Sequence, residues 1–340
     1  MSDTAFSLDL QEKYTRICDL KSSGDKIEIT SLGVADTIPF FFNSESPQAI
    51  DKQAEILMRL YTSLKIKKRV INVMIPDTYT YSQIIQMPSL KEKELLSAIR
   101  YQSDEFIPMP LDETELDIEI LSEDPITKNF LVLIVAAPKK LVTRIERIIE
   151  LAGLRAGNLE NELSAVGRLY KEKLSKLYKD KTVLVVNFGF SSSSLYLINP
   201  QSSFIILTRN FKIGLDLFRK DLDVNLNIDE KKSLEILKTV GFAKGGSYDT
   251  EVILSPVLKE FAGEISKFTA LAKSHFNLDI NTILLCNYDN NISFFDKKIA
   301  ELTSLSTTTL NLKEILVENP VTQSFANTLS SFSGVIGGSL

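Results

Sequence analysis

The same order of strands occurs twice in this chain, once from Phe6 and again just after Asp180. The first copy is FSLDLQEKYTRICDLK followed by DKIEITSLGVA, and the second is KTVLVVNFGFSSSSLYLIN followed by SSFIILTRNF. Each copy reads as an apolar strand, a polar turn, a returning strand and a third strand, with helices afterwards. Two unrelated hairpins are the alternative. The matched order of three strands favours a duplication, and the sequence therefore predicts two similar α/β lobes.

A small module is predicted between Ile84 and Leu121. Pro88 ends a short strand because proline cannot extend a ladder, and Ser89 with Glu92 forms a capping box that starts a helix. A pair of prolines then stops that helix. By periodicity alone, an ordinary piece of a domain core is the favoured interpretation of this module. Its helix and second strand are identified by Leu95, Ile99 and Phe106, by Pro108 and Pro110, and by Leu116, Ile118 and Ile120.

The residues of this module resemble the actin-like PilM family of type IV pilus assembly proteins. The resemblance rests on QMP, on AIRYQSDEFIPMPLDE and on FLVLIVAAPKKLVTRIERIIELAGLRAGNLENELSAVGRLY (Phe130–Tyr170). It implies an α/β fold of the actin, Hsp70 and sugar-kinase superfamily, with two duplicated lobes around a cleft and an inserted small α/β subdomain. The expected lobes are residues 1–180, with the insertion at about 70–150, and residues 181–340.

Composition argues against several classes of function. A net charge of −5 gives no indication of electrostatic binding to nucleic acid or anionic lipid. Cys18 and Cys286 have no CxxC neighbour, so a zinc knuckle or a disulfide frame is not expected. His275 is the only histidine, which excludes a metal site with several histidine ligands within one chain. Near the end of a long apolar helix, beginning at Pro256, it is expected to be structural.

The sequence predicts a cytoplasmic location. The N-terminus, MSDTAFSLDL, lacks the basic start and apolar run of a signal peptide. The longest apolar run, FLVLIVAA, is too short to span a bilayer and reads as a buried strand.

The family resemblance implies two loops that would hold the phosphates of ATP, together with magnesium. In the first loop Asp9 matches the expected aspartate and would be the magnesium ligand, but Gln11 stands where glycine is expected. Glu12 would add negative charge beside the phosphates. Lys13 could offset that charge, although a lone lysine in a turn is more often solvated. Glycine matters in such loops because a side chain obstructs the approach of backbone amides to phosphate.

The second loop and the helices after it match the family in part. Asn187 replaces an aspartate, and an amide supplies no anion to a metal. No glycine remains at the adenosine position, where Cys286, Asn287 and Tyr288 stand. We therefore expect a degenerate nucleotide site with no catalytic residue, for which ATP and magnesium are candidate cofactors. The residues that match are Gly189, Ser191 and Ser192 in the loop, Gly214 before a helix, and Glu235 with Lys238 on a later helix.

The resemblance implies a cytoplasmic scaffold of type IV pilus or related secretion-type assembly, held at the inner face of the membrane through its partners. The implied partner is the short N-terminal tail of a bitopic PilN-like protein, lying in a groove between the first subdomain and the inserted one. Such recognition needs backbone pairing and shallow apolar pockets, and no catalysis. Self-association is left open.

Two alternatives remain. An active ATPase or sugar-kinase-like enzyme would need intact phosphate loops. A division protein similar to FtsA would need a basic amphipathic anchor, and no lysine or arginine follows Lys313.

Overall fold

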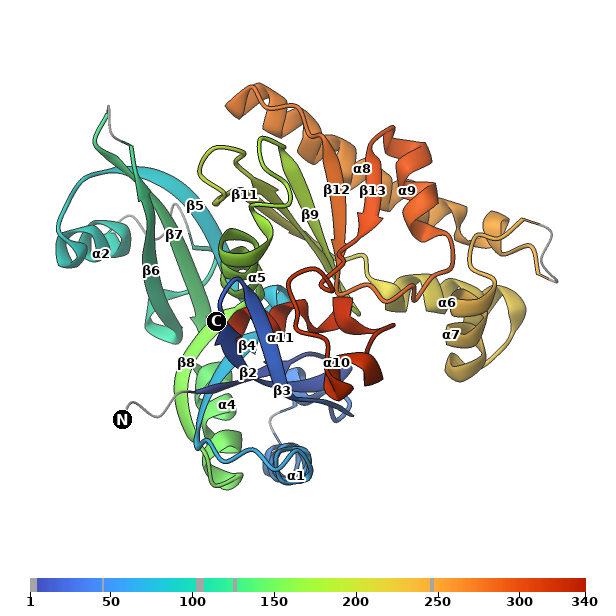
Figure 1. Cartoon of the computed structure of the whole chain (residues 1–340), viewed down its shortest axis with the longest axis horizontal. Helices are drawn as coiled ribbons and strands as arrows, with labels where there is room; N and C mark the ends of the chain where they lie inside the picture. The colour runs from blue at the N-terminus through green and yellow to red at the C-terminus, as the bar shows by residue number, and fades with distance from the viewer. Residues whose placement is uncertain (1–4, 45, 102–106, 125–126, 245–247) are drawn as a thin grey trace. The chain divides into compact units, whose positions relative to one another are not determined.

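The computed structural model describes residues 5–44, 46–101, 107–124, 127–244 and 248–340 (Figure 1). The chain forms two compact units. Unit 1 consists of Met1–Lys173, Ile315–Gln323 and Gly334–Leu340, and unit 2 consists of Leu174–Glu314 and Ser324–Ser333. No helix among the described residues is long and apolar enough to cross a membrane.

Unit 1 is built on a five-stranded mixed sheet with the order β3-β2-β1-β4-β8. The first three strands are antiparallel, and β4 and β8 run parallel to β1. The strands are β1 (Phe6–Leu10), β2 (Tyr14–Ser23), β3 (Lys26–Asp36), β4 (Val70–Ile75) and β8 (Arg155–Asn161).

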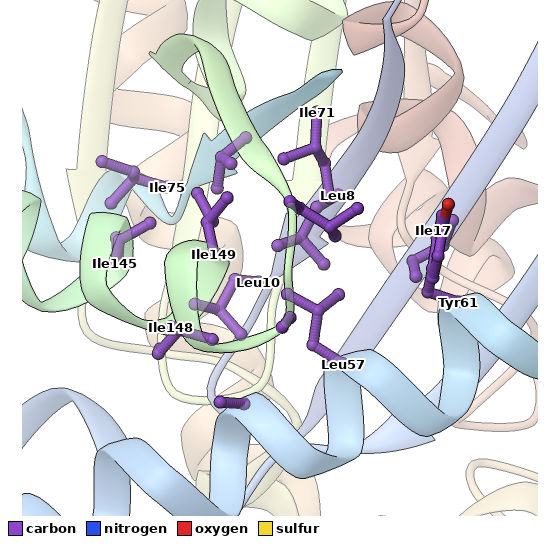
Figure 2. Close-up of a cluster of buried hydrophobic side chains, with 14 of the residues drawn as sticks. Leu8, Leu10, Ile17, Leu57, Tyr61, Ile71, Ile75, Ile145, Ile148 and Ile149 are labelled. Atoms are coloured by element: carbon purple, nitrogen blue, oxygen red, sulfur yellow. The ribbon is translucent and has the colours of Figure 1, made fainter. Parts of the chain in front are cut away.

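Two amphipathic helices, α1 (Pro47–Ser63) and α4 (Lys139–Leu151), cover one face of this sheet and pack against each other. Figure 2 shows Leu57 of α1 and Ile148 of α4 meeting Leu8 and Leu10 of β1 in a single apolar cluster. All four side chains are buried. Burial of such side chains stabilises the unit by about 1.5–3 kcal/mol each.

The last residues of the chain pack against unit 1. The carbonyls of α11 (Ser333–Gly338) accept hydrogen bonds from Ser7 Oγ, at Val335, and from Arg168 Nη1, at Gly337 (2.6 and 2.8 Å). A Cβ at Gly337 would lie 2.1 Å from the carbonyl oxygen of Ala165 in α5 (Glu162–Leu169). Only glycine therefore permits this close approach of two backbones.

The predicted module is a separate three-stranded sheet in unit 1, with the order β5-β7-β6 and one helix. Its elements are β5 (Tyr81–Pro88), α2 (Glu92–Tyr101), β6 (Thr114–Glu123) and β7 (Asn129–Pro138). Leu95 and Ile99 are fully buried against β7, as their spacing predicts. Phe106 lies outside the described residues.

The predicted start of α2 is wrong by about one half-turn. The helix begins at Glu92, and the Glu94 carboxylate accepts a hydrogen bond from the backbone N–H of Lys91 (3.2 Å). This is the reciprocal half of a capping box, shifted two residues beyond Ser89. The side chain of Glu92 is outside the described part of the chain. The acid-rich sequence KEKE offers more than one carboxylate at this spacing, so the pattern could not select the register.

Unit 2 repeats the sheet of unit 1, with the order β11-β10-β9-β12-β13 and the same alternation of antiparallel and parallel pairs. The predicted duplication is therefore confirmed. The strands are β9 (Val183–Phe188), β10 (Ser193–Ile198), β11 (Ile205–Phe211), β12 (Thr282–Cys286) and β13 (Ser306–Thr309).

Helices α6 (Leu215–Leu226), α8 (Thr250–Phe276) and α9 (Phe295–Thr303) cover this second sheet, and α7 (Glu230–Thr239) packs on α6. Phe188 lies at the centre of an aromatic cluster, with ring centroids 5.0–6.3 Å from those of its neighbours. These neighbours are Phe218, Phe261, Tyr288 and Phe295. A further short helix is α10 (Pro320–Ser324), and single turns occur at Phe41–Asn43, Asp77–Tyr79, Leu111–Glu113, Tyr170–Leu174 and Leu329–Phe332.

The long helix α8 begins six residues before the predicted start at Pro256. Proline removes the hydrogen bond to residue 252, but Val252 is 67% exposed, so this turn lies at the surface. His275 is exposed near the end of the helix, and its Nδ1 lies 3.2 Å from the carbonyl of Leu271. It has the placement expected of a structural helix-end histidine.

Candidate functional site

A groove of about 510 Å³ lies within unit 1, between the inserted sheet and the first sheet. It is formed by segments from β4 to β8 that are far apart in the sequence. Its lining residues are Ile75, Thr80, Glu115, Leu116, Asp117, Val135, Ala137, Val142, Thr143, Glu146, Leu159, Glu160 and Asn161. A cavity of this size is in the range that binds small ligands or a few residues of a peptide.

Two edge strands border the groove. β6 is the outer strand of the inserted sheet, and β8 is the outer strand of the first sheet. Each contributes residues to the lining, including Leu116 from β6 and Leu159 from β8. The outer backbone N–H and C=O groups of an edge strand have no partner strand, so they offer hydrogen bonds to an added extended chain.

One polar atom on the groove wall has an unmet hydrogen bond. Thr80 Oγ1 is buried and has no hydrogen-bond partner. An orphaned buried hydroxyl costs about 1–3 kcal/mol.

Glu160 is the most buried of the charged residues that line the groove, and it is already paired. Arg168 of α5 forms a bidentate pair with Glu160 of β8, with one N–O distance of 3.0 Å. Burial raises the pKa of Glu160, and Arg168 opposes that rise. The pair fixes α5 against β8. A ligand in the groove would therefore be contacted by the other lining side chains.

The side chains of the first predicted phosphate loop are bound to one another and to neighbouring side chains of unit 1. Asp9, at the end of β1, accepts a hydrogen bond from Gln11 Nε2 (2.6 Å) and pairs with Arg16 (3.3 Å), which lies directly opposite it on β2. Gln11 Nε2 also donates to the carboxylate of Glu162 on α5 (2.9 Å), which accepts a second bond from the Asp77 backbone N–H (3.0 Å). All these side chains are buried.

This arrangement does not fit a magnesium ion at Asp9. Both carboxylate oxygens of Asp9 are engaged, and the Gln11 side chain occupies the position where a glycine would leave room. Burial raises the pKa of Asp9, although Arg16 and Gln11 oppose the rise. Among the residues that the structure describes, no cluster of three or more acidic, histidine or cysteine side chains could hold a metal. Lys13 is half-buried in the same turn.

The second loop, Asn187–Ser193, is held by backbone contacts within unit 2. Asn187 is buried, and its Nδ2 lies 3.4 Å from the hydroxyl of Tyr196. Gly189 N–H donates to the Ser192 carbonyl (3.0 Å), which closes the turn. Ser192 is buried and Ser191 is half-buried.

Gly214 brings the start of α6 against this loop. A Cβ there would lie 2.4 Å from the carbonyl oxygen of Phe190. The first amides of α6, those of Leu215 and Asp216, donate to the carbonyls of Gly189 and Phe190 (3.1 and 2.8 Å). These helix-start amides are therefore used within the protein, whereas an anion site at a helix N-terminus needs them free.

The other two predicted residues lie apart from this loop. Glu235 and Lys238 are exposed on α7, and Glu235 pairs with Lys232 (3.1 Å). The structure thus brings Asn187, Gly189, Ser192 and Gly214 together but gives Glu235 and Lys238 the contacts of a surface helix.

Two residues that contact the first loop, Arg16 and Glu162, were not predicted from the sequence. Arg16 could have been found, because a tight turn after Asp9 places the residue seven positions later opposite it on the returning strand. For Glu162, which lies in a segment recognised only as a helix start, no signal in the sequence indicated contact with Gln11.

The family model described as type IV pilus assembly protein PilM matches residues 8–333. The solved PilM-PilN type IV pilus biogenesis complex is similar, with a TM-score of 0.84 and 19% identity over 99% of this chain and 97% of that one.

Two other solved structures are more distant. Ethanolamine utilization protein EutJ from Carboxydothermus hydrogenoformans has a TM-score of 0.55 and 10% identity, over 99% of this chain and 89% of that one. MreB 5 of Spiroplasma citri, solved with AMPPNP, has a TM-score of 0.52 and 12% identity, over 98% and 93%. At these identities the likenesses show the fold, and they confirm the predicted actin-like α/β class.

Proposed function

The chain belongs to the family of type IV pilus assembly protein PilM, and from this premise we propose that it is a scaffold that docks the N-terminal tail of a bitopic PilN-like membrane protein. The first lobe, expected over residues 1–180, carries the docking role. The protein then works in the cytoplasm at the inner face of the membrane and is held there by its partners. The observation that carries the proposal is the groove between two edge strands.

The similar complex supports this choice of partner, since it is a complex of PilM with PilN. An extended tail entering the groove would pair with the backbone edge of β6 or β8. Alternate side chains of the tail would then face the apolar wall that includes Val135, Val142 and Leu159. Such docking requires no bond making or breaking, which agrees with a scaffold.

Blocking the groove is expected to abolish tail binding. Thr143 is exposed on α4 and lines the groove, so Thr143→Trp places an indole in the path of the tail while leaving the buried face of the helix unchanged. We expect binding of a tail peptide to weaken about tenfold or more, equivalent to at least 1.4 kcal/mol. Isothermal calorimetry with the N-terminal peptide of the PilN-like bitopic protein measures this.

The matched control is Thr239→Trp, at an exposed threonine at the end of α7. It should bind the peptide as the parent chain does. Equal affinity of the Thr143 and Thr239 variants for the peptide would place the tail elsewhere and remove the groove from the proposal.

We also propose that the nucleotide loops are degenerate and that the protein is no efficient ATPase. Support comes from Asp9, whose oxygens are held by Gln11 and Arg16, and from the α6 amides, which are used by the second loop. Loss of one well-placed group commonly costs a hundredfold or more in rate. The roles of Lys13, Ser191 and Lys238 toward a nucleotide stay predictions.

Magnesium-ATP is therefore expected to stabilise the protein little. A ligand present at its dissociation constant adds only about 0.4 kcal/mol, which is about 1–2 °C in Tm for a domain of this size. With about 1 mM magnesium-ATP, we expect a Tm shift below about 2 °C. A large shift, with hydrolysis that disappears in Asp9→Ala, would show a working nucleotide site.

A further inference from the structure

The walls of the groove carry an excess of negative charge. Glu115 and Asp117 of β6 and Glu146 of α4 line it and are exposed. No ion pair joins these three carboxylates to a cation among the described residues, whereas Glu160 is paired with Arg168. No lysine, arginine or histidine lines the described part of the groove.

The acidic residues of β6 follow the strand period. Glu115, Asp117 and Glu119 alternate with Leu116 and Ile118, which pack against the core of the inserted module. One face of β6 therefore serves the module core and the other carries a row of carboxylates. Glu119 adds to the negative potential around Glu160, so the row continues past the lining residues.

An acidic row on an open strand face would ordinarily serve solubility. Here Glu146 faces the groove from a second element, α4, so carboxylates from two separate parts of the fold surround one concave space. A cleft lined by one sign of charge concentrates its field and favours a ligand of the opposite sign.

We propose that the groove recognises a positive charge on the docked tail. A lysine or arginine beside the apolar residues of the tail pairs with Glu115, Asp117 and Glu146. This inference rests on the proposed function and specifies the chemistry of the partner. The apolar wall and the strand edges hold the tail, and the carboxylates select a basic tail over a neutral one and speed its capture.

The test uses synthetic peptides of about the first 15 residues of the PilN-like bitopic protein. The peptides are N-acetylated, so that the terminal amine carries no charge. One peptide has the natural sequence, and in the other each lysine or arginine is replaced by norleucine or citrulline. Each is titrated into the parent chain and into Glu115→Gln/Asp117→Asn/Glu146→Gln at about 50 and 300 mM salt. The control variant removes three exposed carboxylates elsewhere: Glu28→Gln/Asp51→Asn/Glu260→Gln.

We expect the triple groove variant to bind the natural peptide about tenfold more weakly than the parent chain does, because each exposed ion pair changes the affinity by a fewfold. The neutral peptide should lose a similar factor on the parent chain and nothing further on the groove variant. High salt should weaken only the natural peptide, and the control variant should match the parent.

If both peptides bind the parent and the groove variant equally, independent of salt, the proposed recognition of a basic residue is wrong. The proposed docking of the tail would then still hold. Tight binding of a natural tail that contains no basic residue would also overturn the proposed recognition of a basic residue. If neither peptide binds the parent chain at any salt concentration, the proposed function itself fails.

Discussion

Replacing Arg16 by methionine is expected to destabilise the protein by about 3–5 kcal/mol. Arg16 and Asp9 are both buried and form an ion pair across β1 and β2 at 3.3 Å. Methionine retains much of the volume but leaves the Asp9 carboxylate buried without its cation, with only Gln11 as a hydrogen-bond donor. Urea denaturation, followed by circular dichroism, measures the change in the free energy of unfolding.

Two further variants test the cause of this loss. Arg59→Met breaks the exposed pair with Glu55 and is expected to cost about 0.5 kcal/mol or less. Asp9→Leu combined with Arg16→Met removes both charges and is expected to recover most of the stability, as paired apolar replacements of buried ion pairs do. If Arg16→Met costs no more than Arg59→Met, the first loop is not held by this pair.

Phe188→Ala is expected to cost about 3–5 kcal/mol. Phe188 is buried at the end of β9, and its ring contacts four other aromatic rings of unit 2. Removing it leaves a cavity among rigid rings that cannot easily collapse. Because Asn187 and Gly189 flank Phe188, the same change is expected to loosen the second loop.

The control for this prediction is Phe40→Ala. Phe40 is 80% exposed, so the same substitution there should change stability by about 0.5 kcal/mol or less. Chemical denaturation of both variants gives the comparison. A small effect at Phe188 would mean that the aromatic cluster repacks around the missing ring.

Much of the fold could be predicted from the sequence because its strands are marked by local patterns. The duplicated strands have buried apolar runs ending at Asp9 and Asn187, and the inserted module has the alternation of β6. Boundaries were harder to predict. The sequence KEKE allows several capping registers, so α2 starts at Glu92, and Pro256 is accommodated inside α8 where the helix is exposed.

The groove could be anticipated only through the family resemblance, without its residues. Ile75, Leu116, Val142 and Leu159 come from four elements spread over more than 80 positions of the chain, and no local pattern connects them. The nucleotide loops show the opposite case, since the motifs located them but could not reveal their state. Whether Asp9 meets a metal or an arginine depends on strand register and burial, which a motif does not encode.

The return of residues 315–323 and 334–340 to unit 1 has a consequence for biosynthesis. On the ribosome, strands β1 to β8 emerge first, but Ser7 cannot meet Val335 until 328 further positions have been translated. Such a long-range closure is slow to form. Unit 1 therefore stays incomplete, with the sheet face that receives α11 uncovered, for the whole time that unit 2 is made.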